Sequence, residues 1–334
     1  MKLSLQTIPP KAAHLVLQVE RFLKDQQISL HNQKVLVGFS GGPDSTALFL
    51  ILYLLRQRLN LDLGGLYLNH GLRPEAQKEE EFVLNLGQKL DCPIYVCRTK
   101  VSLLAQKSKR GLEEAGRRIR YAVLQGIARR HKYHWIALGH HLNDLAEDFL
   151  MRLIRGSIWP NLAGMECKRG QFIRPLLFLN KQEILDFLSW LGQDFCVDKT
   201  NFSLDGLRNR VRNTILPLFL RENPKFLQTI FKLWQLAQID KQDLQEKLTK
   251  VKAKIEDKQI ALERNSLARL SPGERLRVYS YYLNQLKPGQ LLFANLLNLE
   301  HLFKQGETNK VIELPKNRFI FLNKETIVFL EKTK

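Results

Sequence analysis

The chain has 334 residues, a length that predicts about two domains. Hydrophobic residues make up 44% of it, which excludes a disordered or fibrous protein. Lys and Arg number 52 against 33 Asp and Glu, and the net charge of +19 is typical of proteins that bind nucleic acid. A basic surface without such a partner is the alternative interpretation. The four cysteines form no CxxC pair, which favours reduced thiols in a cytoplasm, and the longest apolar run, 47–55, is too short to span a bilayer. We therefore predict a cytoplasmic protein without a membrane partner.

Short runs rich in β-forming residues alternate with helical segments through the first half of the chain. The predicted strands are 34–39, 63–69, 93–98 and 133–138, and the predicted helices between them are 46–59, 75–90 and 111–130. Strict alternation predicts an α/β fold, a parallel sheet with helices on both faces. Ligands of such sheets bind beyond the carboxyl ends of the strands, where Ser40–Ser45, Asn69-His70 and Gly139-His140-His141 fall.

The pattern changes after Pro224. Residues 225–305 read as helices without a strand, and 310–330 reads as a small antiparallel set. We therefore predict a domain boundary near residue 220, with a mainly helical second domain, 221–334, that ends in a β-hairpin.

Positive charge is concentrated in two parts of the chain. Residues 98–132 contain eleven Lys and Arg against two Glu, a net +9, and residues 225–334 carry 20 basic and 12 acidic residues, a net +8. Both parts could face a polyanion, although a charge run is often only a solvated surface.

The segment SGGPDS, 40–45, lies between a predicted strand and a predicted helix. Glycines let successive backbone N–H groups converge on an anion, and the helix adds its positive N-terminal end. The segment lacks the lysine of a Walker-type loop. Its Asp44 would repel phosphates unless Mg²⁺ bridges them. The alternative is a glycine turn in which Asp or Ser caps the helix.

SGGPDS after a hydrophobic strand resembles the PP-loop of the N-type ATP pyrophosphatases, which split ATP between the α- and β-phosphates. Four further segments narrow the resemblance to the bacterial tRNA(Ile)-lysidine synthases: NHGLR (69–73), EEAGRRIRY (113–121), GHHLNDLAEDFLMRLIRGS (139–157) and RNRVRNTILPLF (208–219). The likeness covers about residues 30–220. It implies a PP-loop ATP pyrophosphatase domain over 1–220, with an adenine nucleotide α-hydrolase-like fold, and a tRNA-binding domain over 221–334.

The resemblance also implies a reaction. ATP activates C2 of the wobble cytidine of tRNA(Ile), giving an adenylated base and pyrophosphate. An amine of free L-lysine then displaces AMP and leaves lysidine, which changes the codon read from AUG to AUA. The implied cofactors are ATP and Mg²⁺, and the implied partners are free L-lysine and tRNA(Ile) with a CAU anticodon. The oligomeric state is left open, with a homodimer among the options.

Two acids and an arginine are the strongest candidates for chemistry beside Asp44. Asp144 and Glu147 are spaced i, i+3, so their carboxylates share one helix face, where they suit Mg²⁺ or the ammonium of lysine. A pair of solvated helix acids is the alternative. The fork of Arg120 suits the α-phosphate or the charge that develops on the adenylate. The predicted catalytic residues are therefore Asp44, Arg120, Asp144 and Glu147, with Asp44 and Asp144 as Mg²⁺ ligands.

The remaining predicted site residues bind substrates. Those for ATP are Ser40, Gly41, Gly42, Pro43, Asp44, Ser45, Asn69, His70 and Gly139. Those for tRNA are Arg117, Arg118, Arg208, Arg210 and Arg212, and the last three splay over a wide helical arc that suits a nucleic acid. The histidines at 70, 140 and 141 favour packing or nucleotide contact over a zinc site.

The sequence departs from the pattern of this family at two positions. Val197 stands where the family usually has an acid, and Asp148 stands where threonine is common, which leaves the number of metal ligands open.

Another PP-loop enzyme, such as a tRNA thiolase, is disfavoured because the chain has no CxxC pair for sulfur insertion. A non-catalytic RNA-binding protein is disfavoured by the intact acids at 44, 144 and 147.

Overall fold

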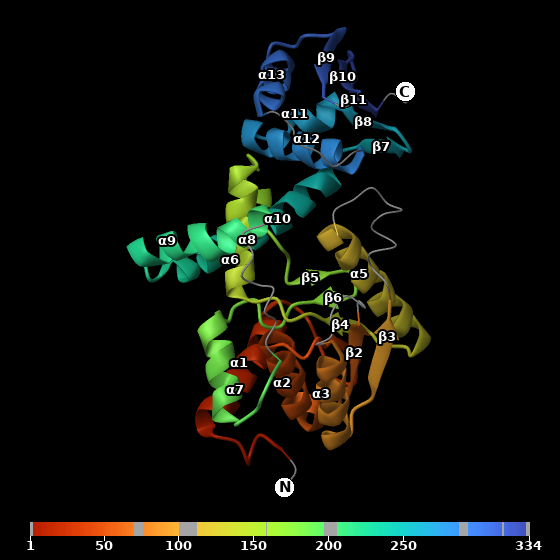
Figure 1. The fold of residues 1–334 in the computed structure, drawn as a ribbon. Coiled ribbons are helices and arrows are strands. Elements are labelled where there is room, and N and C mark those ends of the chain that lie inside the picture. Colours follow the sequence, from red (N-terminus) through yellow and green to blue (C-terminus); the bar gives the residue numbers. More distant parts are fainter. Residues whose placement is uncertain are drawn as a thin grey trace. The chain divides into compact units, whose positions relative to one another are not determined.

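The computed structural model in Figure 1 describes residues 3–69, 76–99, 112–157, 159–196, 206–286, 293–315 and 317–331. The chain forms two compact units. Unit 1 comprises Met1–Met151 and Gly164–Phe231, and unit 2 comprises Arg152–Ala163 and Lys232–Lys334. Within the described ranges, no helix has the length and apolar character needed to cross a membrane.

Unit 1 is built on a six-stranded sheet with the strand order β3-β2-β1-β4-β6-β5. Neighbouring strands pair in parallel, except that β5 and β6 pair antiparallel at one edge. The strands are β1 Lys34–Gly38, β2 Asp62–Asn69, β3 Ile94–Arg98, β4 Trp135–Ala137, β5 Lys168–Arg169 and β6 Phe172–Ile173. The first four correspond to the four strands predicted from the sequence.

Helices cover both faces of this sheet (Figure 1). On one face, Leu124 and Ala128 of α5 pack against Leu36 and Leu66 of the sheet. α2 and α3 lie on the other face, and α1 and α7 pack on the outer side of α2, which is why α2 is apolar nearly all round. The predicted α/β architecture is therefore confirmed. The helices are α1 Pro10–Asp25, α2 Pro43–Leu59, α3 Ala76–Lys89, α5 Leu112–Arg130, α6 Leu142–Ile154 and α7 Lys181–Trp190.

A second group of helical segments follows the sheet in the sequence. α8 Leu207–Arg210, η3 Val211–Ile215 and α9 Leu216–Glu222 run on from one another without a break, and α10 Phe226–Lys250 follows. The middle segment, η3, is a turn of π-helix. Such turns are rare and often mark functional sites.

Unit 2 contains a five-stranded antiparallel sheet with the order β7-β8-β11-β10-β9. Helices α12 and α13 pack on it around one hydrophobic core that includes Tyr279, Leu296 and Phe329. The elements are β7 Ala253–Glu256, β8 Gln259–Glu263, α11 Arg264–Ala268, α12 Pro272–Leu286, α13 Phe293–Lys304, β9 Lys310–Leu314, β10 Arg318–Leu322 and β11 Thr326–Glu331.

The sequence interpretation of residues 225–305 was wrong in one respect, because it contained no strand. β7 and β8 form a hairpin around the turn at Asp257-Lys258, and the C-terminal β element has five strands instead of a lone hairpin. The segment is rich in Lys, Glu, Gln and Ala, which favour helices, and this composition masked the alternation of Ile260 and Leu262 with polar residues.

Candidate active site

The predicted phosphate loop lies between β1 and α2, at the carboxyl edge of the sheet. Gly41 has φ = +80°, a conformation that side chains with a Cβ rarely adopt, and its carbonyl accepts hydrogen bonds from the Cys196 N–H and the Thr46 hydroxyl. The Ser45 hydroxyl donates to the Gly42 carbonyl and lies 3.0 Å from Ser40 Oγ. These bonds hold the loop in an open turn before the helix begins.

The start of α2 is suited to an anion. Gly42 is the N-cap and, among the described residues, no side chain caps this end of the helix. A Cβ on Gly42 would meet only Ser40 Oγ at 3.6 Å and the Cys196 carbonyl oxygen at 4.0 Å, so the loop leaves space there. Backbone N–H groups beside such a space can bind a phosphate.

Gly139 is needed for close packing against the phosphate loop. A Cβ at this position would lie 3.0 Å from the carbonyl carbon of Asp44 and 3.2 Å from the backbone nitrogen of Ser45. Because these are backbone atoms, no side-chain rotation relieves the contact. The glycine after β4 therefore lets the segment before α6 approach the loop, as its predicted place at the site requires.

Asp44 faces two cationic or titratable groups. Lys181 Nζ donates to Asp44 Oδ1 at 2.5 Å, and His141 Nε2 lies 3.6 Å from the same oxygen. His141 Nε2 also lies 3.5 Å from Asp144 Oδ2. The carboxylates of Asp44 and Asp144 thus flank one imidazole, and the two predicted Mg²⁺ ligands are close to each other.

The acids of α6 are bound by two arginines. Arg208 donates to Asp144 Oδ1 at 3.0 Å and to Glu147 Oε2 at 2.9 Å. Arg212 donates to Glu147 Oε1 at 2.6 Å and Oε2 at 3.0 Å, and to Asp144 Oδ1 at 3.2 Å. The predicted shared face of the two acids is present, and two of the arginines predicted for tRNA turn toward it while Arg210 between them is exposed.

Asp144 stays ionised although it is buried. Burial alone would raise its pKa, but the neighbouring His141 and Arg208 side chains and the hydrogen bond from the His141 N–H lower it below the usual range. Burial lowers the pKa of His140 to about 3, so this imidazole is neutral at pH 7. Its Nδ1 is buried and has no hydrogen-bond partner in the described part of the chain.

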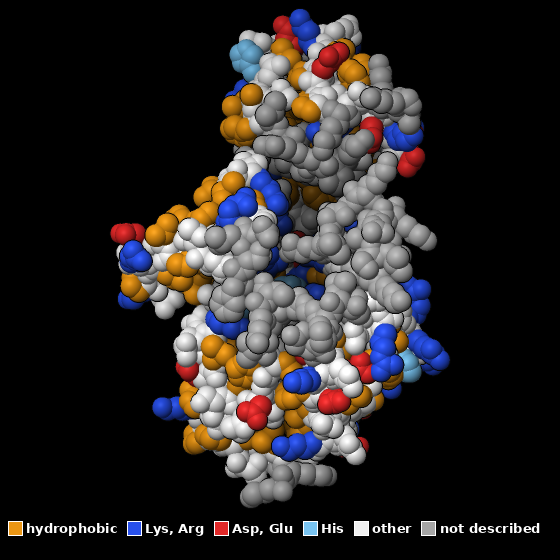
Figure 2. Space-filling model, in the orientation of Figure 1, with side chains coloured by type: hydrophobic (Ala, Val, Ile, Leu, Met, Phe, Trp, Pro, Cys, Tyr) orange, Lys and Arg blue, Asp and Glu red, His pale blue; other side chains and the backbone are white. Residues whose placement is uncertain are grey.

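The predicted arginines of α5 lie along its solvent-facing side. Arg117 and Arg118 are exposed, and the guanidinium of Arg117 lies 5.5 Å from the ring centre of Tyr121. The side chain of Arg120 is also exposed, yet surrounding protein lowers the pKa of its guanidinium by excluding water. Figure 2 shows Lys and Arg side chains at several separate places on the face of the molecule that it draws.

The remaining residues singled out in the sequence either contact residues outside the predicted site or lie outside the described ranges. Asn69, at the end of β2, donates to Glu80 Oε2 of α3 at 3.2 Å. Asp148 Oδ2 lies beside Gly164, 2.8 Å from where a Cβ would stand. Among the residues that the structure describes, no three His, Cys, Asp or Glu side chains form a metal cluster. His70 and Val197 lie outside the described ranges.

Lys181 is the site residue that the sequence interpretation missed. It is the first residue of α7, after Asn180, which forms a capping box with Glu183. A lysine in the first turn opposes the helix dipole, and this unfavourable placement was the available signal. Its position is fixed by a hydrogen bond from its backbone N–H to Asn143 Oδ1 at 2.9 Å.

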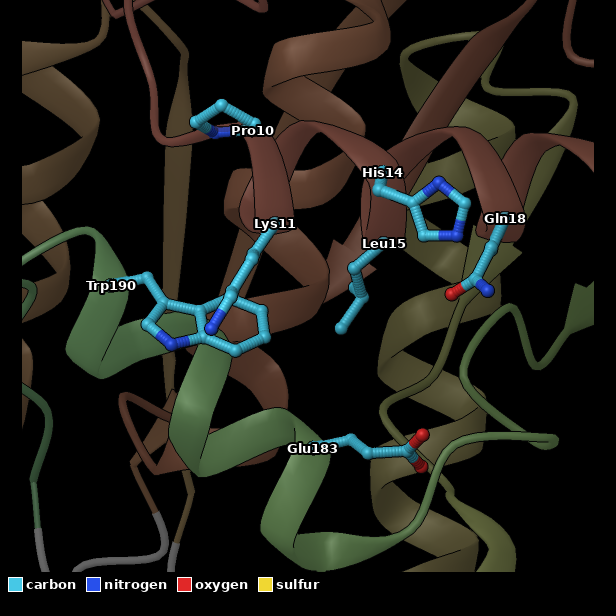
Figure 3. A pocket seen from close by; sticks show the side chains of 7 residues that line it. All are labelled: Pro10, Lys11, His14, Leu15, Gln18, Glu183 and Trp190. Carbon is cyan, nitrogen blue, oxygen red and sulfur yellow. The ribbon is translucent and has the colours of Figure 1, made fainter.

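A separate open groove of about 530 Å³ lies between α1 and α7. Figure 3 shows Lys11 beside Trp190 at one end and Glu183 across from His14. The groove contains none of the predicted site residues, so we assign it no part in the chemistry. Its lining residues are Pro10, Lys11, His14, Leu15, Gln18, Glu183 and Trp190.

A glycine loop at the start of a helix, with acids converging at the carboxyl edge of a parallel sheet, defines the class of protein. The family model of the PP-loop domain matches residues 12–219, so this is a PP-loop protein. The fold is similar to that of the U34-tRNA thiolase NcsA from Methanococcus maripaludis, with a TM-score of 0.56 and 19% identity over 66% of this chain and 79% of that one.

Sequence relatives narrow the class further. The chain is 39% identical over 299 residues to the tRNA(Ile)-lysidine synthase of Nitratidesulfovibrio vulgaris, covering 83% of this chain and 86% of the relative. It is 36% identical to that of Thermosipho africanus over 68% of this chain, and spans 55% of that relative. It is 32% identical to that of Bacillus cereus (strain ATCC 14579) over 89% of this chain, and spans 65% of it. The chain belongs to the tRNA(Ile)-lysidine synthase family.

Proposed function

We propose that this chain ligates lysine to C2 of the wobble cytidine of tRNA(Ile) in two steps, adenylation by ATP and displacement of AMP by an amine of lysine. The observation that carries the proposal is the meeting of the phosphate loop with Asp144 and Glu147 in a member of this family. His141 lies within 3.6 Å of both Asp44 and Asp144, which links the loop to the acids.

The loop binds the phosphates of ATP. The N–H groups at the start of α2 and the hydroxyl of Ser40 donate to phosphate oxygens, and the helix dipole favours the negative charge. The Ser45 hydroxyl would join them by turning away from the Gly42 carbonyl to which it donates. Arg120 supplies a fork for the α-phosphate, where charge develops as pyrophosphate leaves.

The acids at 44 and 144 fit Mg²⁺. Mg²⁺ is commonly held by one or two carboxylates together with substrate phosphates, and these two carboxylates flank one imidazole beside the phosphate loop. Bound there, the ion would neutralise phosphate charge. In the structure, Lys181 binds Asp44 Oδ1, and Arg208 and Arg212 bind Asp144 Oδ1. Positively charged groups therefore already lie at the two carboxylates that would bind the ion.

Glu147 suits the ammonium of lysine. It lies one helical turn beyond Asp144, and it accepts hydrogen bonds from Arg208 and Arg212, which do not belong to the phosphate loop. A carboxylate there can bind one amino group of lysine and orient the other toward the adenylated base.

The tRNA would meet the basic surface. Arg117, Arg118 and Arg210 are exposed, and residues 225–334 carry a net +8. ATP, lysine and tRNA are all found in the cytoplasm, where we propose that the chain acts. A homodimer stays a prediction that the mass in solution would test.

The proposal is tested with ATP, radiolabelled lysine and transcripts of tRNA(Ile) and tRNA(Met). We expect pyrophosphate release and incorporation of lysine with tRNA(Ile), and neither with tRNA(Met). Incorporation of sulfur without lysine would instead indicate a thiolase, and tRNA binding without pyrophosphate release would indicate a non-catalytic protein.

A further inference from the structure

Arg208 and Arg212 cover Asp144 and Glu147, the acids that the proposed function assigns to Mg²⁺ and to lysine. They are four residues apart, so their side chains leave the same side of the helical segment and reach Asp144 and Glu147 together. Every one of the four carboxylate and guanidinium groups takes part in at least two of these hydrogen bonds.

The two sides of this cluster differ in exposure. The side chains of Asp144 and Glu147 are 10% and 2% exposed, whereas those of Arg208 and Arg212 are 24% and 33% exposed. The arginines therefore cover the acids and keep a surface that faces solvent. A ligand that approaches from solvent meets the guanidiniums first.

The cluster is also balanced in charge. Two carboxylates face two guanidiniums, so an added ammonium would enter a site that is already neutral. Burial would lower the pKa of Arg212, but its hydrogen bond to Glu147 and the charges of Glu147 and Asp144 raise the pKa overall. The arginines thus compete directly with the amino group of lysine for the same oxygens.

Resting on the proposed function, we propose that Arg208 and Arg212, which cover the Asp144–Glu147 pair, keep lysine from Glu147 until a phosphate of a bound substrate draws the two guanidiniums away. The exchange conserves charge-assisted contacts, since each arginine gives up a carboxylate for a phosphate and Glu147 takes the ammonium instead. Lysine binding would then follow the binding of the phosphate-bearing substrate. Both arginines act as positioning residues in this step.

The backbone is built for such a movement. Arg212 lies in the π-helical turn η3, Val211–Ile215, directly after α8. Converting this turn between π and α hydrogen bonding would change the direction of Arg212 relative to Arg208 without unfolding the helix. Few-kcal/mol differences between such arrangements are what a ligand can shift.

Equilibrium dialysis of radiolabelled lysine tests the proposal on the full chain. The wild type is measured alone, with a non-hydrolysable ATP analogue, with a tRNA(Ile) transcript and with both. We expect lysine to bind about tenfold or more weakly to the protein alone than to the protein with at least one phosphate ligand. The two single-ligand arms show whether the phosphate comes from ATP or from RNA. Equal affinity in all four arms would overturn the proposal.

Substitutions of the two arginines test whether these side chains block the binding of lysine. Arg212→Gln and Arg208→Gln should bind lysine more tightly than the wild type when no phosphate ligand is present. Arg221→Gln is the matched control, because Arg221 lies in α9, on the same run of helical segments, is exposed and belongs to none of the proposed sites. If the first two variants bind lysine like Arg221→Gln, the proposal is wrong; if they do not fold, the wild-type comparison decides alone.

The same wild-type protein is assayed for lysidine formation with all substrates. Absence of product would count against the proposed function itself. Product formation together with tight lysine binding to the protein alone would reject only the proposal that the two arginines block lysine binding.

Discussion

Each unit of the molecule pairs arginine with buried carboxylate, and the two clusters differ in a way that separates function from stability. In unit 2, Arg275 of α12 binds Glu300 of α13 through Nε at 2.9 Å and Nη2 at 2.6 Å, and both side chains are almost fully buried, 7% and 6% exposed. In unit 1, the acids are buried but the arginines are partly exposed.

The surroundings explain the difference. The guanidinium of Arg275 lies 4.8 Å from the ring centre of Phe303 and also donates to the Leu270 carbonyl, so it is fixed from several sides within one core. Arg208 and Arg212 come from a helix with a π turn and keep a face in solvent. An arginine and a carboxylate that are equally buried indicate a pair that stabilises the fold. Buried acids covered by partly exposed arginines indicate a site where another cation can replace the arginines.

The largest expected effect is on chemistry in unit 1. Asp44→Asn should reduce pyrophosphate release at least about 10²-fold, because a neutral amide cannot hold a cation among the ATP phosphates. The free energy of unfolding should change by less than about 1 kcal/mol, since the Asp44–Lys181 pair is about one third exposed. Asp62→Asn, which removes an exposed acid paired with Lys34, is the control and should keep full turnover. Near-normal turnover of Asp44→Asn would refute the assignment.

The next effect is on stability in unit 2. Glu300→Gln should lower the free energy of unfolding by about 3–5 kcal/mol, because it leaves Arg275 buried without its counter-charge. Lys304→Gln is the matched control. Lys304 lies 3.8 Å from the same carboxylate but is 56% exposed, so its loss should cost less than about 0.5 kcal/mol. Urea unfolding of the full chain measures both, and similar values for the two variants would remove the contrast between the clusters.

A smaller effect tests the packing that supports the loop. Gly139→Ala should cost about 1–3 kcal/mol and weaken ATP binding, because its Cβ meets the backbone of Asp44 at 3.0 Å. Gly126→Ala is the control: its Cβ would meet nothing within 4 Å, and it lies within α5, so it should stabilise the protein by up to about 1 kcal/mol. Thermal unfolding and ATP titration give the answer, and unchanged ATP affinity in Gly139→Ala would show that the contact is not needed.

The smallest effect is a pH dependence. The pKa of His140 is about 3 in the folded chain and near 6.5 in the unfolded one. As the pH falls below 6.5, the unfolded state takes up a proton that the folded state refuses, so His140 reduces stability by up to about 1.4 kcal/mol per pH unit. Urea unfolding at pH 7 and pH 5 should show a smaller loss for His140→Gln than for the wild type. Equal losses would mean that His140 is not buried as a neutral group.

Much of unit 1 could be predicted because its signals are local. The strands around β1 are short apolar runs bounded by turns, and the glycines of SGGPDS mark the turn that brings the backbone of Asp44 and Ser45 up to Gly139. The spacing of Asp144 and Glu147 also predicts their shared face without knowledge of the fold.

The rest depends on contacts between distant residues. Nothing near Lys181 in the sequence indicates Asp44, which is 137 positions away. The two-residue strands β5 and β6 are too short to give a periodic pattern. The inward turn of Arg208 and Arg212 follows from the buried acids opposite them, whereas their sequence alone suggested an open basic surface.

The central claim is that the acids of α6 serve the two chemical steps, and the most direct test follows those steps separately in Asp144→Asn and Glu147→Gln. Pyrophosphate release and lysine incorporation are measured with tRNA(Ile) transcript while lysine is varied over a wide range. We expect Asp144→Asn to impair pyrophosphate release, since its carboxylate shares His141 with Asp44, and Glu147→Gln to retain release with a raised KM for lysine. Equal loss of pyrophosphate release in both variants would contradict this division and place the lysine site elsewhere.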